Sequence, residues 1–259
     1  MADSWSDGIA YEHFIGRWSR QVAPRFVRWL QAPPGLRWLD VGCGTGALAA
    51  AVLDNAAPAK VLGIDPSAAF LEEARSRLDG APVELRVGTA VDAPPEAADV
   101  VVSGLMLNFA PDAEAAVAAM GAAAPAGTIA CYVWDYAGRM QLLRTFWDVA
   151  CSLDAAAIDL DEAQRFSLCE PSALVSLWKR SGLSDVGTAG IEVTTEFDDF
   201  EDLWRPFLGG TGAAPAYVAT LDAPARDRLR EGMARMVHPD PDGRIRMHAR
   251  AWAVRGQAA

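Results

Sequence analysis

The sequence predicts an α/β fold: a Rossmann-like, mostly parallel sheet of seven strands, with helices on both faces and a helical lid inserted before the last strand. Between residues 37 and 134, short apolar runs alternate five times with segments of helical spacing. The runs are continuously apolar, which is typical of parallel strands buried on both faces. Their short connections predict right-handed strand–helix–strand units.

The first elements follow from apolar spacing and from helix-ending residues. Apolar residues recur at helical spacing from Tyr11 to Leu30, and Pro33, Pro34 and Gly35 end that helix. Ser67 is a suitable N-cap for a helix over 67–78. The other elements predicted in this part are strands at 37–41, 60–64, 83–87, 99–103 and 128–134 and helices at 47–53 and 113–123.

The alternation changes after Trp134. Helices are predicted at 138–150 and 171–181, and strands six and seven at 186–195 and 245–254. Two neighbouring strands need only a short loop between them, so we interpret the long segment before the seventh strand as a cover over a pocket. This segment contains an acidic aromatic helix at 197–208, a glycine-rich turn at 209–212 and an arginine-rich helix at 225–236.

Composition limits the partners and the compartment. The net charge is −11 and there are only two lysines, Lys60 and Lys179, so we expect no nucleic-acid partner. The absence of any run of 18 apolar residues predicts no membrane span. The N-terminus lacks a signal-peptide pattern and the four cysteines form no CxxC pair, which together favour a cytoplasmic protein with reduced thiols. No His/Asp/Glu group has metal-ligand spacing, so no metal is predicted.

A glycine-rich turn follows the first predicted strand and places acids near it. Asp40 ends the strand, Gly42, Gly44 and Gly46 follow, and Asp65 ends the next strand. Ligands of open α/β sheets lie beyond the carboxyl ends of the strands. Glycines let the backbone turn sharply there, and Asp65 is placed to accept both ribose hydroxyls. The pattern suits a nucleoside with a charged amino-acid tail, whose ammonium group would meet Asp40.

A dinucleotide site is the closest alternative. Gly42-x-Gly44-x-x-Ala47 fits the pattern G-x-G-x-x-G/A, and Asp65 lies at a suitable distance for a ribose. Two features oppose this interpretation. Asp40 would repel a pyrophosphate, and the third glycine is at position 46.

Several segments together resemble the class I methyltransferases that depend on S-adenosylmethionine (SAM). Asp40 to Gly46 resembles motif I of this family, and Gly63 to Ser67 resembles the segment after its second strand. Asp99 to Ser103 followed by Leu105 resembles motif IV, and Ala124 to Thr128 resembles the turn before strand five. The combination is similar to the ubiquinone/menaquinone-type and small-molecule methyltransferases of bacteria. It implies SAM as methyl donor and S-adenosylhomocysteine (SAH) as product.

The resemblance also implies roles for individual residues. Thr89 stands where the family usually has the acid that meets the adenine amine, so only a backbone contact at Ala90 is expected to persist there. Ser103 and Leu105 would line the cleft near the sulfonium. The other implied cofactor residues are Gly42, Gly44 and Gly46 along the methionine part and adenosine, Asp65 at the ribose, Pro66 and Ser67 beside the adenine, and Tyr11, Arg17 and Trp18 on a covering helix.

Methyl transfer from a sulfonium is an in-line displacement that depends mainly on alignment, an effect worth roughly 7–11 kcal/mol. His13 is a candidate general base on the covering helix, although a helix histidine of purely structural role fits the same position. Asp135 and Tyr136 end the fifth strand, where the acceptor meets the methyl group. The chain would act as a monomer or homodimer.

The aromatic side chains of the covering segments predict an aromatic or otherwise apolar small-molecule acceptor, methylated at O, N or C. Two alternatives remain: an NAD-type oxidoreductase, and a protein of the SAM fold with a non-methylating role. We predict a single class I methyltransferase domain over 1–259. Within it, 1–30 would form the N-terminal covering helix, 36–135 the SAM-binding core, and 136–185 and 197–242 the substrate-cover segments.

Overall fold

The computed structural model describes residues 16–209 and 212–259, which form two compact units. The sheet unit comprises Ser19–Trp134, Leu168–Ile191 and Ala251–Ala259. The helical unit comprises Asp135–Ser167, Glu192–Arg250 and the described residues up to Trp18. Each unit is described by itself below, and the single-domain boundaries given above stay a prediction.

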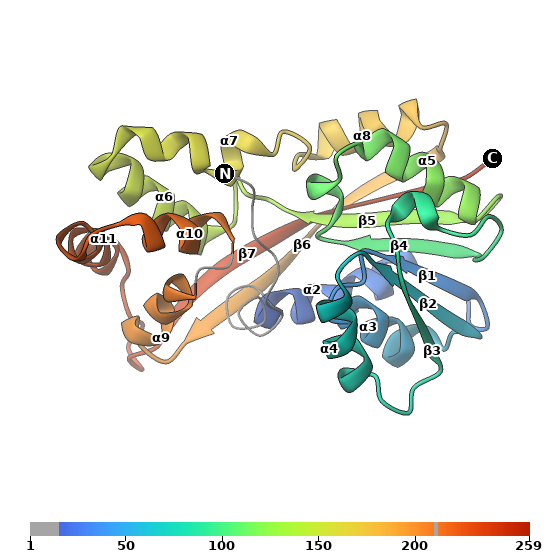
Figure 1. Ribbon diagram of the computed structural model, residues 1–259, viewed down its shortest axis with the longest axis horizontal. Coiled ribbons are helices and arrows are strands. Elements are labelled where there is room, and N and C mark those ends of the chain that lie inside the picture. The colour runs from blue at the N-terminus through green and yellow to red at the C-terminus, as the bar shows by residue number, and fades with distance from the viewer. Residues whose placement is uncertain (1–15, 210–211) are drawn as a thin grey trace. The chain divides into compact units, whose positions relative to one another are not determined.

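A seven-stranded sheet runs in the order β3-β2-β1-β4-β5-β7-β6 (Figure 1). Strands β1 to β5 pair in parallel, and β7 is antiparallel to β5. The predicted mostly parallel sheet is therefore confirmed. The strands are β1 (Arg37–Val41), β2 (Lys60–Asp65), β3 (Val83–Val87), β4 (Val100–Gly104), β5 (Thr128–Trp134), β6 (Ser184–Phe197) and β7 (Ile245–Gln257).

The strand order reverses beside β1, and this reversal locates the crevice where ligands of such sheets bind. β1 pairs with β2 on one side and with β4 on the other, so that Asp40 lies between Gly63 and Val102 in the register. The core of β1, β4 and β5 is buried on both faces, as their continuously apolar sequences indicate. The carboxyl ends of these strands therefore meet at one edge of the sheet.

Helices cover both faces of the sheet. Helix α3 contacts β1 and β2 and helix α4 contacts β2 and β3, whereas α5 contacts β4 and β5 and lies beside α8 on the other face (Figure 1). Ser67 caps α4, because its side chain accepts a hydrogen bond from the backbone amide of Phe70. The elements of this unit are α2 (Arg17–Leu30), which starts at the unit boundary, α3 (Ala47–Ala56), α4 (Ala68–Arg77), η2 (Ala90–Asp92), η3 (Leu107–Phe109), α5 (Ala113–Ala123) and α8 (Pro171–Arg180).

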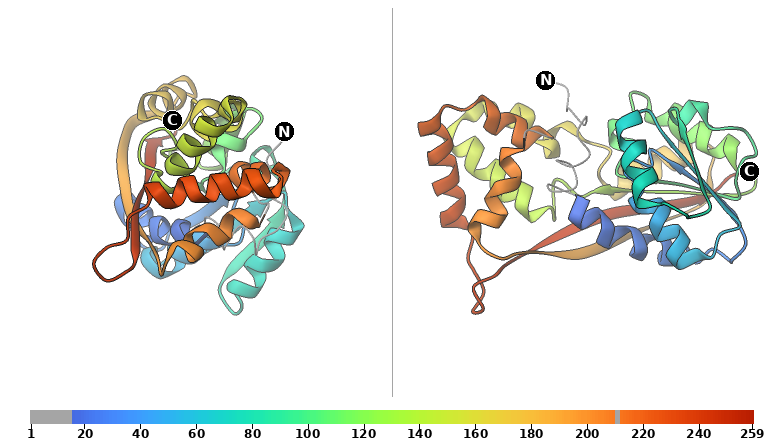
Figure 2. Two further views of the ribbon diagram at one scale, coloured as in Figure 1. Left: turned by 90° about the vertical axis from the view of Figure 1, so that its left-hand side faces the viewer. Right: turned by 60° about the horizontal axis from the view of Figure 1, so that its bottom comes forward.

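The helical unit groups α6, α10 and α11 (Figure 2), and its core is a cluster of buried aromatic rings. Phe146 stacks on Phe207 with ring centroids 4.7 Å apart and meets Trp147 edge-on at 4.9 Å. Gly232 allows α11 to approach α6, because a Cβ there would lie 2.4 Å from Val149. The helices are α6 (Gln141–Leu153), η4 (Ala155–Leu160), α7 (Glu162–Arg165), α9 (Phe200–Trp204), η5 (Arg205–Leu208), α10 (Ala213–Thr220) and α11 (Ala223–Met236).

Two features of the structure bear on the predictions for the second half of the chain. Helix α8 groups with the sheet unit, although the predicted cover segment 136–185 includes it. The role of the inserted helices as a lid stays a prediction. Among the described residues, no helix combines the length and the apolarity that a membrane span requires.

Candidate cofactor site

The turn between β1 and α3 brings three glycines to the carboxyl ends of the parallel strands. Gly42, Gly44 and Gly46 have φ values of 70°, 53° and 83°, in the left-handed region that favours glycine. The backbone amides of Gly42 and Cys43 both donate to the carbonyl of Ile64, at 2.8 and 3.0 Å. The turn is therefore fixed to the end of β2.

The three glycines differ in what surrounds them. A Cβ on Gly42 would lie 2.4 Å from Cγ of Met106, and a Cβ on Gly46 would lie 3.0 Å from Cδ1 of Leu78. A Cβ on Gly44 would meet no described residue within 4 Å. Packing thus excludes a side chain at Gly42 and crowds one at Gly46, whereas the backbone of Gly44 is open toward the described residues.

Asp40 carries a buried carboxylate at the end of β1. It is 1% exposed, and among the described residues neither of its oxygens accepts a hydrogen bond of good geometry. Burial raises the pKa of Asp40 to about 8, the negative charge of Asp65 adds to this rise, and the nearby backbone amide of Ala49 opposes it. A buried carboxylate ionises readily only beside a cation or several donors. The position therefore suits the ammonium group of a ligand.

Asp65 holds the glycine turn and α4 together. Its Oδ2 accepts from the amide of Gly44 at 2.9 Å, and its Oδ1 accepts from the amide of Ser67 at 2.8 Å. Burial raises the pKa of Asp65, and these two backbone hydrogen bonds oppose the rise. Each carboxylate oxygen can accept a second hydrogen bond, so both remain able to meet ribose hydroxyls. Pro66 is exposed beside it.

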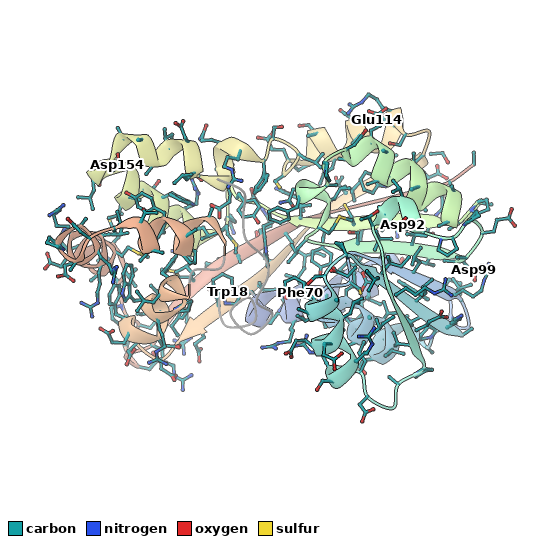
Figure 3. All side chains as sticks on the ribbon, in the orientation of Figure 1. Trp18, Phe70, Asp92, Asp99, Glu114 and Asp154 are labelled. Carbon is teal, nitrogen blue, oxygen red and sulfur yellow. The ribbon has the colours of Figure 1, made fainter. Side chains whose placement is uncertain are left out.

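An acid lies at the end of β3 although position 89 carries none. The amide and the hydroxyl of Thr89 both donate to Oδ2 of Asp92 at 2.8 Å, and these bonds hold the pKa of Asp92 below its ordinary value. Asp92 follows the carboxyl end of β3, whereas Asp99 precedes the amino end of β4 (Figure 3). Sequence reasoning missed Asp92, although the Thr-x-x-Asp spacing of a capping motif was available. Ala90, which lies between Thr89 and Asp92 in the sequence, is buried.

The turn after β4 holds two buried polar groups without partners. Ser103 is fully buried, and neither its hydroxyl nor the side-chain amide nitrogen of Asn108 has a hydrogen bond among the described residues. Leu105 has a φ of 61°, a strained value for a branched residue, and its amide donates to the carbonyl of Tyr132 at 2.8 Å. Sequence reasoning did not single out Met106 or Asn108. The turn reaches the glycine turn through the contact of Met106 with Gly42.

Asp135 and Tyr136 belong to the helical unit. The Asp135 carboxylate accepts from the amides of Gly138 and Arg139 at 2.9 and 3.0 Å. It also accepts from Nε and Nη2 of Arg250 at 2.8 and 2.6 Å. These four bonds make Asp135 the anchor of the chain after β5. Tyr136 is buried in the same unit.

The predicted covering helix is described only in part. Tyr11 and His13 lie outside the described residues, and Arg17 is the first residue of α2. Trp18 is buried, and its ring meets that of Phe197 edge-on at 6.0 Å within the helical unit. Contacts of these residues with SAM stay a prediction.

Comparisons with known proteins show similarity to methyltransferases. Residues 39–127, which include the glycine turn and the ends of β2 and β4, match the family described as "Methyltransferase domain". The chain is also 26% identical over 260 residues to a trans-aconitate 2-methyltransferase of Methylobacterium nodulans, covering 95% of this chain and 94% of that protein. These matches support a class I SAM-dependent methyltransferase.

Two further relatives match only part of this chain. A trans-aconitate 2-methyltransferase of Methylobacterium radiotolerans is 32% identical over 136 residues, covering 52% of this chain and 51% of that protein. One of Variovorax paradoxus is 34% identical over 104 residues, covering 40% of each. The chain thus spans about half the length, or less, of these two curated relatives.

Solved methyltransferase structures share the fold of this chain. A putative methyltransferase from an antibiotic biosynthesis pathway of Anabaena variabilis superposes with a TM-score of 0.61 at 18% identity, covering 90% of this chain and 96% of that one. The phosphoethanolamine N-methyltransferase 2 of Haemonchus contortus, in complex with SAM, superposes with a TM-score of 0.57 at 17% identity, covering 97% of this chain and 56% of that one. At these identities the likeness concerns the fold alone.

Proposed function

We propose that this protein is an enzyme that transfers the methyl group of SAM to O, N or C of a small-molecule acceptor. The observation that carries the proposal is the Asp40 carboxylate at the end of β1, which is buried and has no well-formed hydrogen bond among the described residues. SAM is a sulfonium compound with a free ammonium group, and a buried acid at this place can pair with that cation. The described residues therefore fit SAM.

The other contacts follow from the strand ends. Asp65 would accept the ribose hydroxyls while it keeps its bonds to the glycine turn. Asp92 lies beside Thr89 at the adenine end and offers the acid that position 89 lacks. Ser103 and Leu105, at the end of β4, would line the reacting end of the cofactor.

SAM supplies an electrophilic methyl group, and the chain's part is to orient the acceptor and to exclude water. We assign Asp135 a positioning role, because all its hydrogen bonds go to groups of the helical unit and hold the chain that follows β5. Proton removal by His13 or Tyr136 remains part of the proposal only for an acceptor whose reacting group carries a proton.

For the acceptor, we propose a small carboxylic acid as the leading class. The supporting observation is that the three curated relatives are named trans-aconitate 2-methyltransferases. The aromatic side chains that suggested an apolar acceptor are largely buried against one another, as the ring contacts of Phe146, Trp147 and Tyr217 illustrate. They form the core of the helical unit, so they give the aromatic acceptor less support than the sequence alone suggested.

The test measures binding and turnover separately. Calorimetric titration with SAM, SAH and NAD, on wild type and Asp65→Asn, establishes the cofactor; the exposed Asp79→Asn serves as a matched control. Transfer of a labelled methyl group is then measured for trans-aconitate, for saturated tricarboxylates and for a set of phenols and amines. Binding of NAD alone would overturn the proposal, and SAH binding without turnover of any small molecule would favour a non-methylating role.

A further inference from the structure

The helical unit contains a hollow that none of the predicted site residues lines. Its volume is about 490 Å³, within the range of small-ligand pockets. It lies between the start of α6 and one residue of β7. The lining residues are Gly138, Arg139, Gln141, Arg144, Thr145, Asp148 and His248.

The two walls of this hollow are tied to each other. The amide of Arg250 donates to the carbonyl of Arg139 at 2.8 Å, and Met140 forms an isolated bridge with Ala249. The side-chain oxygen of Gln141 accepts a hydrogen bond from the backbone amide of His248 at 3.0 Å. Because these contacts are already made, a ligand would not have to order the walls.

Helix α6 begins at the hollow without a side-chain cap. Its N-cap residue, Met140, makes no capping hydrogen bond, and the first bond back to it comes from the amide of Arg144. The amides of the first turn therefore lack partners within the helix and, together with the helix dipole, favour an anion.

Arg144 adds a buried donor. Its Nη2 pairs with Asp161, which is 3% exposed, while its Nε is buried with no hydrogen-bond partner among the described residues. Such a donor is costly unless a ligand or water satisfies it. Arg139 pairs with Glu192 at 3.0 Å, but both side chains are about half exposed, so this pair is weak and Arg139 can turn to a ligand.

We propose that the hollow binds a small oxyanion, through carboxylate or phosphate oxygens, between the guanidiniums of Arg139 and Arg144 and the first turn of α6. The hydroxyl of Thr145 and the imidazole of His248 complete a lining rich in donors. Asp148 is the one acidic side chain among these lining residues, and its negative charge opposes the binding of highly charged anions. The proposal concerns the helical unit alone and does not depend on methyl transfer.

The test uses the full chain and titrates inorganic phosphate and citrate separately by calorimetry. Arg144→Lys keeps the charge facing Asp161 but loses the forked donor, and should weaken binding roughly tenfold, the size of one charge-assisted hydrogen bond. Arg139→Gln should weaken it several-fold. Asp148→Asn, a variant of the same hollow, should strengthen it because it removes a repelling charge.

The two probes distinguish the source of the oxyanion: saturable binding of phosphate alone indicates a phosphate group, and of citrate alone a carboxylate. SAH titration and thermal melting of each variant confirm that the protein is folded. The proposal is overturned if neither probe binds at millimolar concentration, or if binding is the same in wild type and all three variants.

Discussion

Replacing Asp40 by asparagine should stabilise the ligand-free protein and at the same time remove its cofactor binding. The pKa of Asp40 is raised from its ordinary 3.8 to about 8, first by burial and then by the charge of Asp65. Because the pKa of Asp40 is raised in the folded state, the stability contributed by its neutral carboxyl is fully present below pH 3.8. This contribution is lost as the pH rises towards 8.

The size of the effect follows from this interval. Each unit of pKa shift corresponds to about 1.36 kcal/mol, so ionised Asp40 reduces the free energy of unfolding by at most about 4 kcal/mol at pH 7. Asparagine leaves its own buried polar atoms without partners, at about 1–3 kcal/mol. We therefore expect Asp40→Asn to gain about 1–3 kcal/mol at pH 8 and to lose about 1–3 kcal/mol at pH 4, where the wild-type carboxyl is also neutral and only the cost of the buried asparagine remains.

Binding should change in the opposite direction. Loss of a charge-assisted hydrogen bond to the ligand's ammonium group should weaken SAH binding by about 10- to 100-fold. In wild type, SAH affinity should rise between pH 6 and pH 8, because Asp40 must ionise to bind the cation. In Asp40→Asn this rise should disappear.

Urea unfolding of the ligand-free protein at pH 4 and pH 8 measures the stability, and calorimetry between pH 6 and pH 8 measures SAH binding. Exposed Asp79→Asn changes the charge equally and should alter neither quantity. The reasoning is refuted if ligand-free Asp40→Asn is less stable than wild type at pH 8, or if it binds SAH with wild-type affinity.

Three further predictions concern the surrounding turns. Gly42→Ala should cost about 2 kcal/mol or more in urea unfolding, because its Cβ would overlap Met106 in addition to the backbone strain, whereas Gly44→Ala should cost about 1 kcal/mol; equal losses would contradict the role of Met106. Asp135→Asn should cost about 3 kcal/mol by leaving its buried ion pair incomplete, yet leave SAH affinity unchanged; weaker SAH binding in the folded variant would show that this acid affects the cofactor site. Asn108→Leu should retain the stability and SAH affinity of wild type but raise the KM of the acceptor, because it removes a buried donor that lacks a protein partner; an unchanged KM would exclude contact with the acceptor.

Local sequence patterns were sufficient for the sheet and for the position of the glycine turn. Continuous apolar runs reflect burial on both faces, and helical spacing reflects one turn of a helix, so both are properties of neighbouring residues. The N-cap of α4 at Ser67 was predictable for the same reason, since the cap contacts a residue three positions along the chain. The position of Asp65 near the glycine turn was predictable too, because it is set by the length of one strand–helix–strand unit.

Contacts between distant residues could not be predicted in this way. The pairing of Asp135 with Arg250 joins residues 115 positions apart, and Met106 reaches Gly42 from the turn after β4. Sequence spacing therefore predicted a contact of Asp135 with the acceptor, which stays a prediction, but could not predict that its carboxylate also anchors a turn.

The sequence by itself determined the strand–helix alternation, the glycine turn and its two acids, and with them the resemblance to a family. Only the tertiary structure decided that, among the described residues, Gly44 is the open one of the three glycines, that the Asp40 carboxylate is buried with no well-formed hydrogen bond, and that basic side chains gather at the start of α6. The physical reason is that the spacing of residues along the chain shows only which residues are neighbours within one helix turn or one strand. Burial and unsatisfied hydrogen bonding depend on which distant segments pack together.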